Sequence, residues 1–242
     1  CHRKFSVGAD GLLVVKNSDV ADIEMVYYNS DGSRASMCGN GLRCFVKFVY
    51  DNNIVNKEKI DVDTLDGIKK IKINLKNKDI DTITVNMGQG SFKCSDIPIN
   101  SNEEIFINKE INVLDEKFMV NCMHMGVPHT VIFVDDMDMN KIHKYGPLIE
   151  KHEIFPEGTN VNFVKIIDEK NILVRTWERG CGYTLGCGTG ITASVIISNY
   201  LKKVKDSVKV TSEGGSIIID FIDNEAYMTG KAIKICEGNL EV

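Results

Sequence analysis

The sequence lacks several features that would tie it to a membrane or to a nucleic acid. No apolar run approaches the 18 residues that a membrane-spanning helix needs, and the first residues do not form a signal peptide. There is no run of lysine and arginine, and the formal net charge is −5. We therefore expect a cytoplasmic protein with neither nucleic acid nor membrane as a partner. The ligand is predicted to be a small molecule.

The eight cysteines also lack the spacing of known cysteine frameworks. None forms a Cys-x-x-Cys pair of the kind that binds zinc, and they make no dense pattern of disulfide partners. This predicts no metal site and favours a reducing compartment. A secreted protein with disulfides is the alternative, and the absence of a leader argues against it.

One short cysteine motif occurs twice and organises the rest of the sequence. Residues 38–41 read Cys-Gly-Asn-Gly, residues 187–190 read Cys-Gly-Thr-Gly, and each copy runs directly into an apolar segment. We expect a helix to begin at each cysteine. The first turn of a helix has unpaired N–H groups and a positive dipole end, which favour an anion and lower the pKa of a neighbouring thiol.

Two such helix starts aimed at one ligand would suit a two-base racemase or epimerase. Their N–H groups would hold a carboxylate, while one sulfur removes the Cα proton and the other returns a proton to the opposite face. The alternative is a pair of unrelated loop cysteines with glycines that serve turns. A single copy of the motif would favour that alternative, and the repeat makes the two interpretations comparable.

Hydrophobic periodicity predicts strands around both helices. Apolar residues from 42 to 50 follow a helical period, whereas residues 191–201 are apolar on nearly all sides and predict a buried helix. The second half is expected to repeat the plan of the first, with strands, a helix that begins at the cysteine, and a hairpin. Strands are predicted at residues 11–15, 22–28, 59–65, 67–75, 80–88, 118–125, 130–136, 160–166, 172–178, 207–213, 216–223 and 226–230.

Longer segments around the two motifs resemble the diaminopimelate epimerases. They are NSDGSRASMCGNGLRCFVKFV and ERGCGYTLGCGTG, with GADGLL before them and FPEGTNVNFV between them. The resemblance implies an α+β fold of two pseudo-symmetric domains, each a mainly antiparallel sheet or barrel wrapped around a central helix. The first domain would span residues 1–98, completed by 229–242, and the second would span 99–228. The first strand of the family is missing here. Trimming of the sequence explains this better than a degenerate member, because an incomplete half-sheet would expose a long edge.

The resemblance implies a specific reaction. Members of this family invert LL-2,6-diaminopimelate to the meso isomer in lysine and peptidoglycan biosynthesis, with two thiols and without pyridoxal phosphate, any other cofactor or a metal. The expected partner is therefore a small amino-acid substrate. A homodimer is the assembly that family members often form.

The resemblance also implies roles for single positions. Cys38 and Cys187 would be the acid–base thiols, polarised by His129 and Glu178 respectively. The distal end of the substrate would be bound by Asn29, Asn160 and Arg179. The reacting carboxylate would be held by backbone N–H groups of Gly39, Asn40, Gly188 and Thr189. Taken singly, the histidine, the Glu-Arg pair and the asparagines would each be interpreted as structural, and only the joint match supports these roles.

Two departures leave the substrate open. Val127 replaces the asparagine of the family's Gly-Asn-Pro-His segment and cannot make its hydrogen bonds, and Tyr183 replaces the glutamate of Gly-Glu-Thr. One alternative is a racemase of the same type for another amino acid, such as histidine. A protein that binds an amino acid without turning it over is a further alternative, which the presence of both thiols disfavours.

Overall fold

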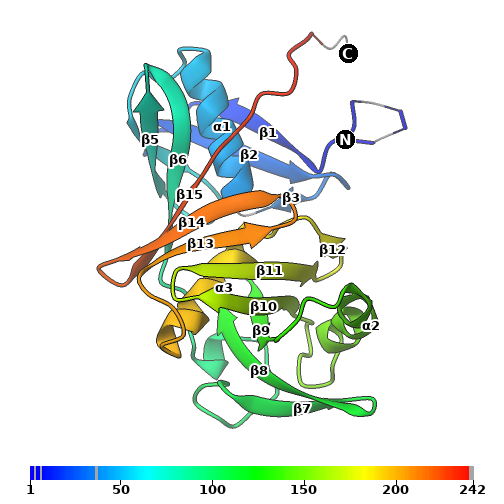
Figure 1. Cartoon of the computed structure of the whole chain (residues 1–242). Helices are drawn as coiled ribbons and strands as arrows, with labels where there is room; N and C mark the ends of the chain where they lie inside the picture. Colours follow the sequence, from blue (N-terminus) through cyan, green and yellow to red (C-terminus); the bar gives the residue numbers. More distant parts are fainter. Residues whose placement is uncertain (3, 6, 36–37, 240–242) are drawn as a thin grey trace. The chain divides into compact units, whose positions relative to one another are not determined.

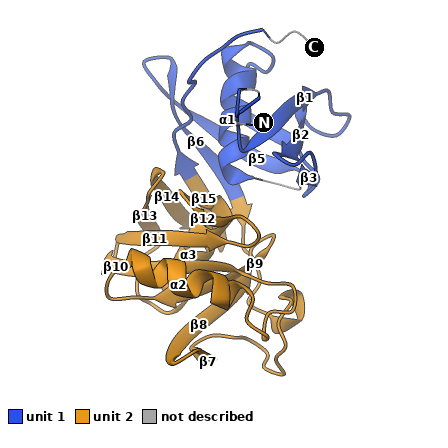
Figure 2. Cartoon of the chain, turned by 90° about the vertical axis from the view of Figure 1, so that its right-hand side faces the viewer, with its two compact units in different colours: residues 1–86, 229–242 blue, residues 87–228 orange. Residues whose placement is uncertain are grey.

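The computed structural model describes residues 1–2, 4–5, 7–35 and 38–239. The chain forms two compact units, of which unit 1 comprises residues 1–86 and 229–242 and unit 2 comprises residues 87–228 (Figure 2). The chain passes between them inside β6 (Asp79–Gly88) and inside β15 (Glu225–Gly230). Residues 87–98, which the sequence analysis placed in the first domain, cluster with unit 2. Because β6 continues across this point, no break in the strand pattern marks the division.

Unit 1 contains one mixed sheet in the order β1-β2-β4-β5-β6. Its neighbouring strands are antiparallel except for the parallel pair β2 and β4. The strands predicted at residues 67–75 and 80–88 form the hairpin β5–β6, and Asn77 and Lys78 both take positive φ in its two-residue turn. The remaining bounds are β1 (Gly11–Lys16), β2 (Ile23–Asn29), β3 (Arg34–Ala35), which pairs with β2, β4 (Lys59–Asp63) and β5 (Lys69–Lys76).

Helix α1 (Gly39–Asp51) packs its apolar side into the core of unit 1 beside β1 (Figure 1). The predicted period is confirmed, since Leu42, Phe45, Val46 and Val49 are fully buried. Arg43 is buried with them, and its guanidinium donates to the carbonyl groups of two residues and to one side-chain oxygen. Such bonds are what allows a charged side chain to be buried.

Unit 2 contains a larger mixed sheet in the order β14-β13-β11-β10-β9-β8-β7, with β12 paired to β11. Two neighbouring pairs, β9 with β10 and β11 with β13, are parallel, and the others are antiparallel. The strands are β7 (Lys109–Val113), β8 (Glu116–His124), β9 (Pro128–Phe133), β10 (Asn160–Asp168), β11 (Asn171–Glu178), β12 (Gly182–Thr184), β13 (Ser207–Ser212) and β14 (Gly215–Ile222).

Helix α3 (Gly188–Tyr200) is buried on nearly all sides, as its uniform apolarity predicts. It packs against β8, β9, β10 and β11 of unit 2 (Figure 1). Its three buried hydroxyl groups donate to carbonyl oxygens four residues earlier, so none is left unsatisfied: these belong to Thr192, Ser194 and Ser198.

Unit 2 has the predicted strands, the helix that begins at its cysteine and the hairpin β13–β14, and it adds elements that were not predicted. A third helix, α2 (Met139–Glu150), packs against β7, β10, β11 and β12. It begins at Asp138, whose carboxylate accepts from the first backbone N–H groups, and it buries Ile142, Tyr145 and Ile149. Pro147 lies inside the helix and obscures its pattern. The strands β3, β7 and β12 and the short 3-10 helix η1 (Cys94–Asp96) were also not predicted. Across the described ranges, no helix is long and apolar enough to span a membrane.

Candidate active site

Both motif cysteines are the N-cap residues of their helices. Cys38 precedes α1 and Cys187 precedes α3, each with extended backbone angles. Each sulfur accepts a hydrogen bond from the backbone N–H three residues later, at 3.3 Å from Gly41 and 3.4 Å from Gly190. The thiols thus take the place that a serine or aspartate side chain usually occupies. Each sulfur therefore lies at the positive end of a helix dipole.

The residues that follow each cysteine begin the helix. Gly39 and Asn40 open α1, and Gly188 and Thr189 open α3. Backbone N–H groups in this first turn have no acceptor within their own helix, so they are suited to an anion. The structure therefore gives both motifs the predicted local form, one in each unit.

Cys187 lies in a buried and negatively charged environment. Its side chain is 9% exposed, its sulfur is 3.3 Å from the hydroxyl of Thr189, and the carboxylate of Glu178 acts on it electrostatically. Burial and then the charge of Glu178 raise the pKa of the Cys187 thiol to about 12, and the bonds from Thr189 and Gly190 only partly oppose this. At neutral pH this thiol carries its proton, which it can donate.

Glu178 is held at the end of β11. The hydroxyl of Thr184 donates to its Oε1 at 2.5 Å, and β12 pairs with β11 so that Glu178 lies opposite Gly182. The threonine of the segment in which Tyr183 departs from the family pattern thus orients the carboxylate beside Cys187.

A buried carboxylate, Glu150, fixes the turn that follows Glu178. It is 7% exposed, and its two oxygens accept from the indole N–H of Trp177 at 2.7 Å and from the backbone N–H of Gly180 at 2.9 Å. Sequence reasoning missed Glu150 because it ends α2, which was itself not predicted. No feature of the sequence connects it with Trp177, 27 residues away.

Asn160 and Arg179 lie together at the same turn. The amide of Asn160 is 6% exposed, accepts from the backbone N–H of Arg179 at 3.0 Å and donates to the carbonyl of Pro128 at 2.9 Å. The guanidinium of Arg179 donates to the carbonyl of Glu157 at 3.0 Å. The side chain of Asn160 therefore joins β9, β10 and the turn after β11. Its predicted contact with the distal end of a substrate stays a prediction.

His129 lies one residue into β9 and is completely buried. Its Nδ1 is 3.2 Å from the amide nitrogen of Asn162, and its Nε2 has no hydrogen-bond partner among the residues that the structure describes. Burial, and then the charges of His124 and Arg179, lower the pKa of this imidazole to about 3. His129 is therefore a neutral ring with one unsatisfied nitrogen.

The predicted residues of unit 1 lie at the ends of its elements. Asn29 ends β2 and donates from its side chain to the hydroxyl of Ser33 at 3.1 Å, across the turn to β3. Asn40 accepts from the buried guanidinium of Arg43 at 2.9 Å, and burial lowers the pKa of that guanidinium. Ser36 and Met37, which belong to the motif before Cys38, lie outside the described residues.

The two positions that depart from the family pattern have contacts of their own. The carbonyl of Val127 accepts from the N–H of Met125 at 2.9 Å in the turn before β9. The hydroxyl of Tyr183 donates to Glu213 at 2.5 Å, and its ring centroid lies 5.1 Å from that of His143 on α2. Burial and then Glu213 raise the pKa of Tyr183 to about 12. Tyr183 therefore ties β12 to α2 and to the turn between β13 and β14.

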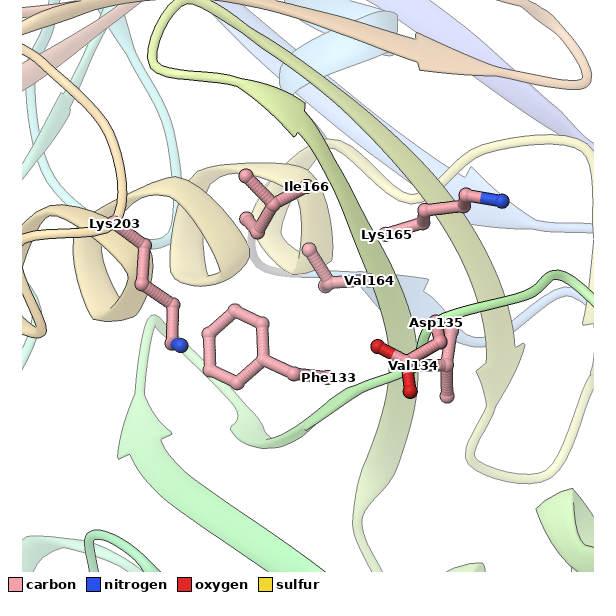
Figure 3. Close-up of a pocket in the computed structure, with 7 residues that line it drawn as sticks. All are labelled: Phe133, Val134, Asp135, Val164, Lys165, Ile166 and Lys203. Atoms are coloured by element: carbon pink, nitrogen blue, oxygen red, sulfur yellow. The ribbon is translucent and has the colours of Figure 1, made fainter.

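Unit 2 also has a surface pocket that is separate from the residues predicted for the site (Figure 3). It holds about 250 Å³, and no residue predicted for the site lines it. The ammonium of Lys203 lies 5.0 Å from the ring centroid of Phe133 at its wall. Within the described part of the chain, no three histidine, cysteine or acidic side chains gather as metal ligands would.

The sequence is similar to that of diaminopimelate epimerases along nearly its whole length. The sequence model of the diaminopimelate epimerase family matches residues 1–93 and 121–235. A diaminopimelate epimerase of Clostridium perfringens is 50% identical over 98% of this chain and 86% of its own length. The enzyme of the same name from Alkaliphilus metalliredigens is 47% identical over 98% of this chain and 84% of its own length. That from Methanothermobacter thermautotrophicus is 44% identical over 99% and 86%.

Solved structures of related folds match at lower identity. A hydroxyproline epimerase from Agrobacterium vitis superposes with a TM-score of 0.68 at 15% identity, covering 91% of this chain and 71% of its own. A phenazine biosynthesis protein of the PhzF family from Bacillus anthracis gives a TM-score of 0.68 at 19% identity, covering 98% and 86%. At these identities the likeness shows the fold alone, and it confirms the predicted α+β class.

Proposed function

Since this chain belongs to the diaminopimelate epimerase family, we propose that it is an isomerase that inverts one α-carbon of LL-2,6-diaminopimelate to give the meso isomer. The observation that carries the proposal is the pair of cysteine N-caps, one in each unit. A reaction at a carbon beside a carboxylate needs an anion site and two acid–base groups, and each helix start offers one thiol and a row of N–H groups. The meso product would serve lysine and peptidoglycan synthesis.

The proposed chemistry moves one proton in and one proton out. A thiolate, assigned to Cys38 in one direction, removes the Cα proton, and the C–H electron pair stays on the substrate as an enolate-like anion. The thiol of Cys187 then breaks its S–H bond and donates that proton to the opposite face of the same carbon. The reverse direction begins with the charges exchanged. The raised pKa of Cys187 supports its role as the protonated partner.

Backbone groups at the helix starts would stabilise the anion that forms. The N–H groups of Gly39, Asn40, Gly188 and Thr189 are assigned to the reacting carboxylate, where negative charge increases as the Cα proton leaves. Such dipoles are fixed before the reaction and need no rearrangement during it. The scheme uses no cofactor, because the thiols move the protons and the N–H groups hold the charge.

Two side chains would control the protonation of the thiols. The charge of Glu178 raises the pKa of Cys187 in the same unit, which supports its assignment to that thiol. His129 is assigned to Cys38, and its neutral ring, whose buried Nε2 has no hydrogen-bond partner among the described residues, supports a role as a hydrogen-bonding partner of a thiol. Both assignments keep one cysteine charged and the other neutral.

The distal amino-carboxylate end is assigned to Asn29, Asn160 and Arg179. A guanidinium and amide groups can bind a carboxylate and an ammonium by directed hydrogen bonds. Of the two departures from the family pattern, Tyr183 has its hydroxyl bonded to Glu213 and its ring on His143, which supports a role in packing. Val127 remains the position at which a different distal group would be recognised.

Proton exchange in D₂O tests the function directly. LL-diaminopimelate is incubated with the full-length, reduced protein and followed by NMR, with L-histidine in a parallel tube. We expect the Cα proton signal of diaminopimelate to disappear while the meso isomer forms. Exchange of histidine alone would transfer the mechanism to another substrate, and no exchange in either tube would refute the epimerase assignment.

The cysteines themselves are tested by Cys38→Ser and Cys187→Ser in the same assay. Each change is expected to slow epimerisation about 10²- to 10⁴-fold, the usual share of one acid–base group. Cys44→Ser is the matched control, because Cys44 is an exposed cysteine on α1 itself. Full two-way activity in either motif variant would rule out the two-thiol scheme.

A further inference from the structure

Asn162 is a completely buried amide to which the mechanism above gives no task. It lies on β10, two residues after Asn160. Its amide nitrogen is 3.2 Å from Nδ1 of His129, 3.3 Å from the carbonyl oxygen of Thr130 and 3.5 Å from that of Asn160. Its amide oxygen accepts from the hydroxyl of Thr176 at 3.0 Å. Every polar atom of this side chain therefore has a partner within unit 2.

These contacts fix which way the amide of Asn162 points. The nitrogen faces two carbonyl oxygens, which can only accept, while the oxygen faces a hydroxyl, which can donate. Exchanging the two ends would set the amide oxygen of Asn162 against the carbonyl oxygens of Thr130 and Asn160. In a buried site, the loss of those bonds would cost more than any gain at the hydroxyl.

The orientation of Asn162 decides the tautomer of His129. An amide NH₂ group donates hydrogen bonds and cannot accept them, so the imidazole nitrogen that faces it must be the unprotonated one. That nitrogen is Nδ1, and the neutral ring therefore carries its single proton on Nε2. Nε2 is buried and has no acceptor among the described residues. Because a buried N–H normally has a partner, this donor is available to a further acceptor.

We propose that Asn162 is a positioning residue that holds His129 as the Nε2–H tautomer, so that the ring presents a hydrogen-bond donor to the thiolate of Cys38. This inference deepens the proposed function and rests on it for the identity of the thiolate. It makes His129 a donor that stabilises the charged sulfur, and not a base that takes the proton from it. The histidine would then remain neutral throughout the reaction.

The same amide also lies against the start of α3. A Cβ atom placed on Gly190 would be 2.3 Å from the Oδ1 atom of Asn162, so a larger residue there would displace this amide. The N–H of Gly190 is the group that donates to the sulfur of Cys187. Asn162 therefore lies between His129 and the helix start that carries the second cysteine, in the core of one unit.

Nitrogen NMR of the ring tests the tautomer without any substrate. The protein is labelled with ¹⁵N-histidine, and the resonances of His129 are assigned among the five histidines by their loss in His129→Gln. We expect wild-type Nδ1 to have the shift of an unprotonated nitrogen and Nε2 that of a protonated one. A wild-type ring with its proton on Nδ1 overturns the proposal.

Variants then test whether Asn162 is the cause. Asn162→Leu keeps a similar shape without a donor, and we expect both nitrogen shifts of His129 to move toward intermediate values as the tautomers mix. The matched control is Asn121→Leu. Asn121 is a buried amide on β8 whose side chain is also hydrogen-bonded at both ends, to the backbone N–H of Asn108 and the carbonyl of Val131 instead of to a histidine ring. If Asn162→Leu does not fold, Asn162→Ala, which also has no donor, serves the same comparison. A ring that stays wholly in the Nε2–H form without the amide overturns the proposal.

Kinetics connect the tautomer to the reaction. In the variant at position 162, we expect kcat for epimerisation to fall about 100-fold, the low end of the contribution of one acid–base group, with KM changed less than about threefold. Equal kcat in the position 162 and position 121 variants overturns the positioning role. Wild-type protein with the Nε2–H ring but no proton exchange on diaminopimelate would instead refute the proposed function and leave the tautomer assignment in place.

Discussion

At the scale of single residues, Cys187 shows how a helix start and a half-buried carboxylate oppose each other. The helix dipole and the N–H of Gly190 favour the thiolate, whereas burial and Glu178 favour the thiol, and the thiol form prevails. A catalytic acid needs such a balance, because its proton must be present at neutral pH and still leave during the reaction. The substrate carboxylate would add a further charge beside it.

Glu178→Gln changes this balance in a measurable direction. Removing the negative charge lowers the pKa of Cys187, so more thiolate is present at pH 8 and alkylation by iodoacetamide accelerates, about tenfold for each pKa unit. Peptide mass spectrometry measures the rate, with the exposed Cys236 as an internal reference. An unchanged rate ratio would contradict the role of Glu178.

The same shift predicts how stability depends on pH. The pKa of Cys187 is raised in the folded protein, so the contribution of this thiol is complete below the unfolded pKa near 9 and is lost as pH rises toward 12. In Glu178→Gln the folded pKa is lower, so this alkaline loss should end at a lower pH and be smaller in total. Urea unfolding of both proteins between pH 9 and pH 12 compares the total losses.

At the scale of elements, a matched pair of substitutions compares how tightly the two helix starts are packed. Gly190→Ala places a methyl group 2.3 Å from Asn162, whereas in Gly41→Ala the nearest atom, the Cβ of Cys38, is 3.3 Å away. We expect the first change to lower the free energy of unfolding by about 1–3 kcal/mol through overpacking, and the second to have a smaller effect. Urea denaturation measures both. Equal losses would mean that Asn162 can move aside.

Glu150 gives a second prediction about an element, the turn after β11. Glu150→Ala leaves the indole N–H of Trp177 and the N–H of Gly180 without their acceptor, at about 1–3 kcal/mol for each group that stays buried. Activity should fall as well, because the turn carries Glu178 and Arg179. Glu153→Ala is the control, since Glu153 is an exposed acidic residue in the next loop. Losses equal to those of the control would show that the turn is held by other contacts.

Much of the secondary structure could be predicted from local pattern, and much of the site could not. The alternation of apolar and polar residues predicted most strands, and the cysteine motifs predicted the starts of α1 and α3. Each of these patterns is contained in about ten consecutive residues, so it can be recognised without knowledge of the fold. Helix α2 was missed because Gly146 and Pro147 interrupt its apolar period. The tautomer of His129 depends on the parallel pairing of β9 with β10, which joins residues about 30 positions apart.

At the scale of the whole molecule, the proposed mechanism requires one thiol from each unit to reach the same carbon. In that mechanism both thiols face one site, and an oxidant would join them when no substrate lies between them. We expect mild oxidation to link Cys38 to Cys187, abolish epimerisation and be reversed by a thiol reductant. Peptide mapping under non-reducing conditions identifies the link. Inactivation without a peptide that joins these two residues would contradict the prediction.

The passage of the chain between its units inside β6 and β15 has a consequence for synthesis on the ribosome. Unit 2 is continuous in sequence, whereas unit 1 is assembled from both ends of the sequence described here. A nascent chain therefore emerges with every residue of unit 2 before the last strand of unit 1 has been made. We therefore expect unit 2 to complete its fold before unit 1, the reverse of the usual order, because unit 1 includes residues after 228.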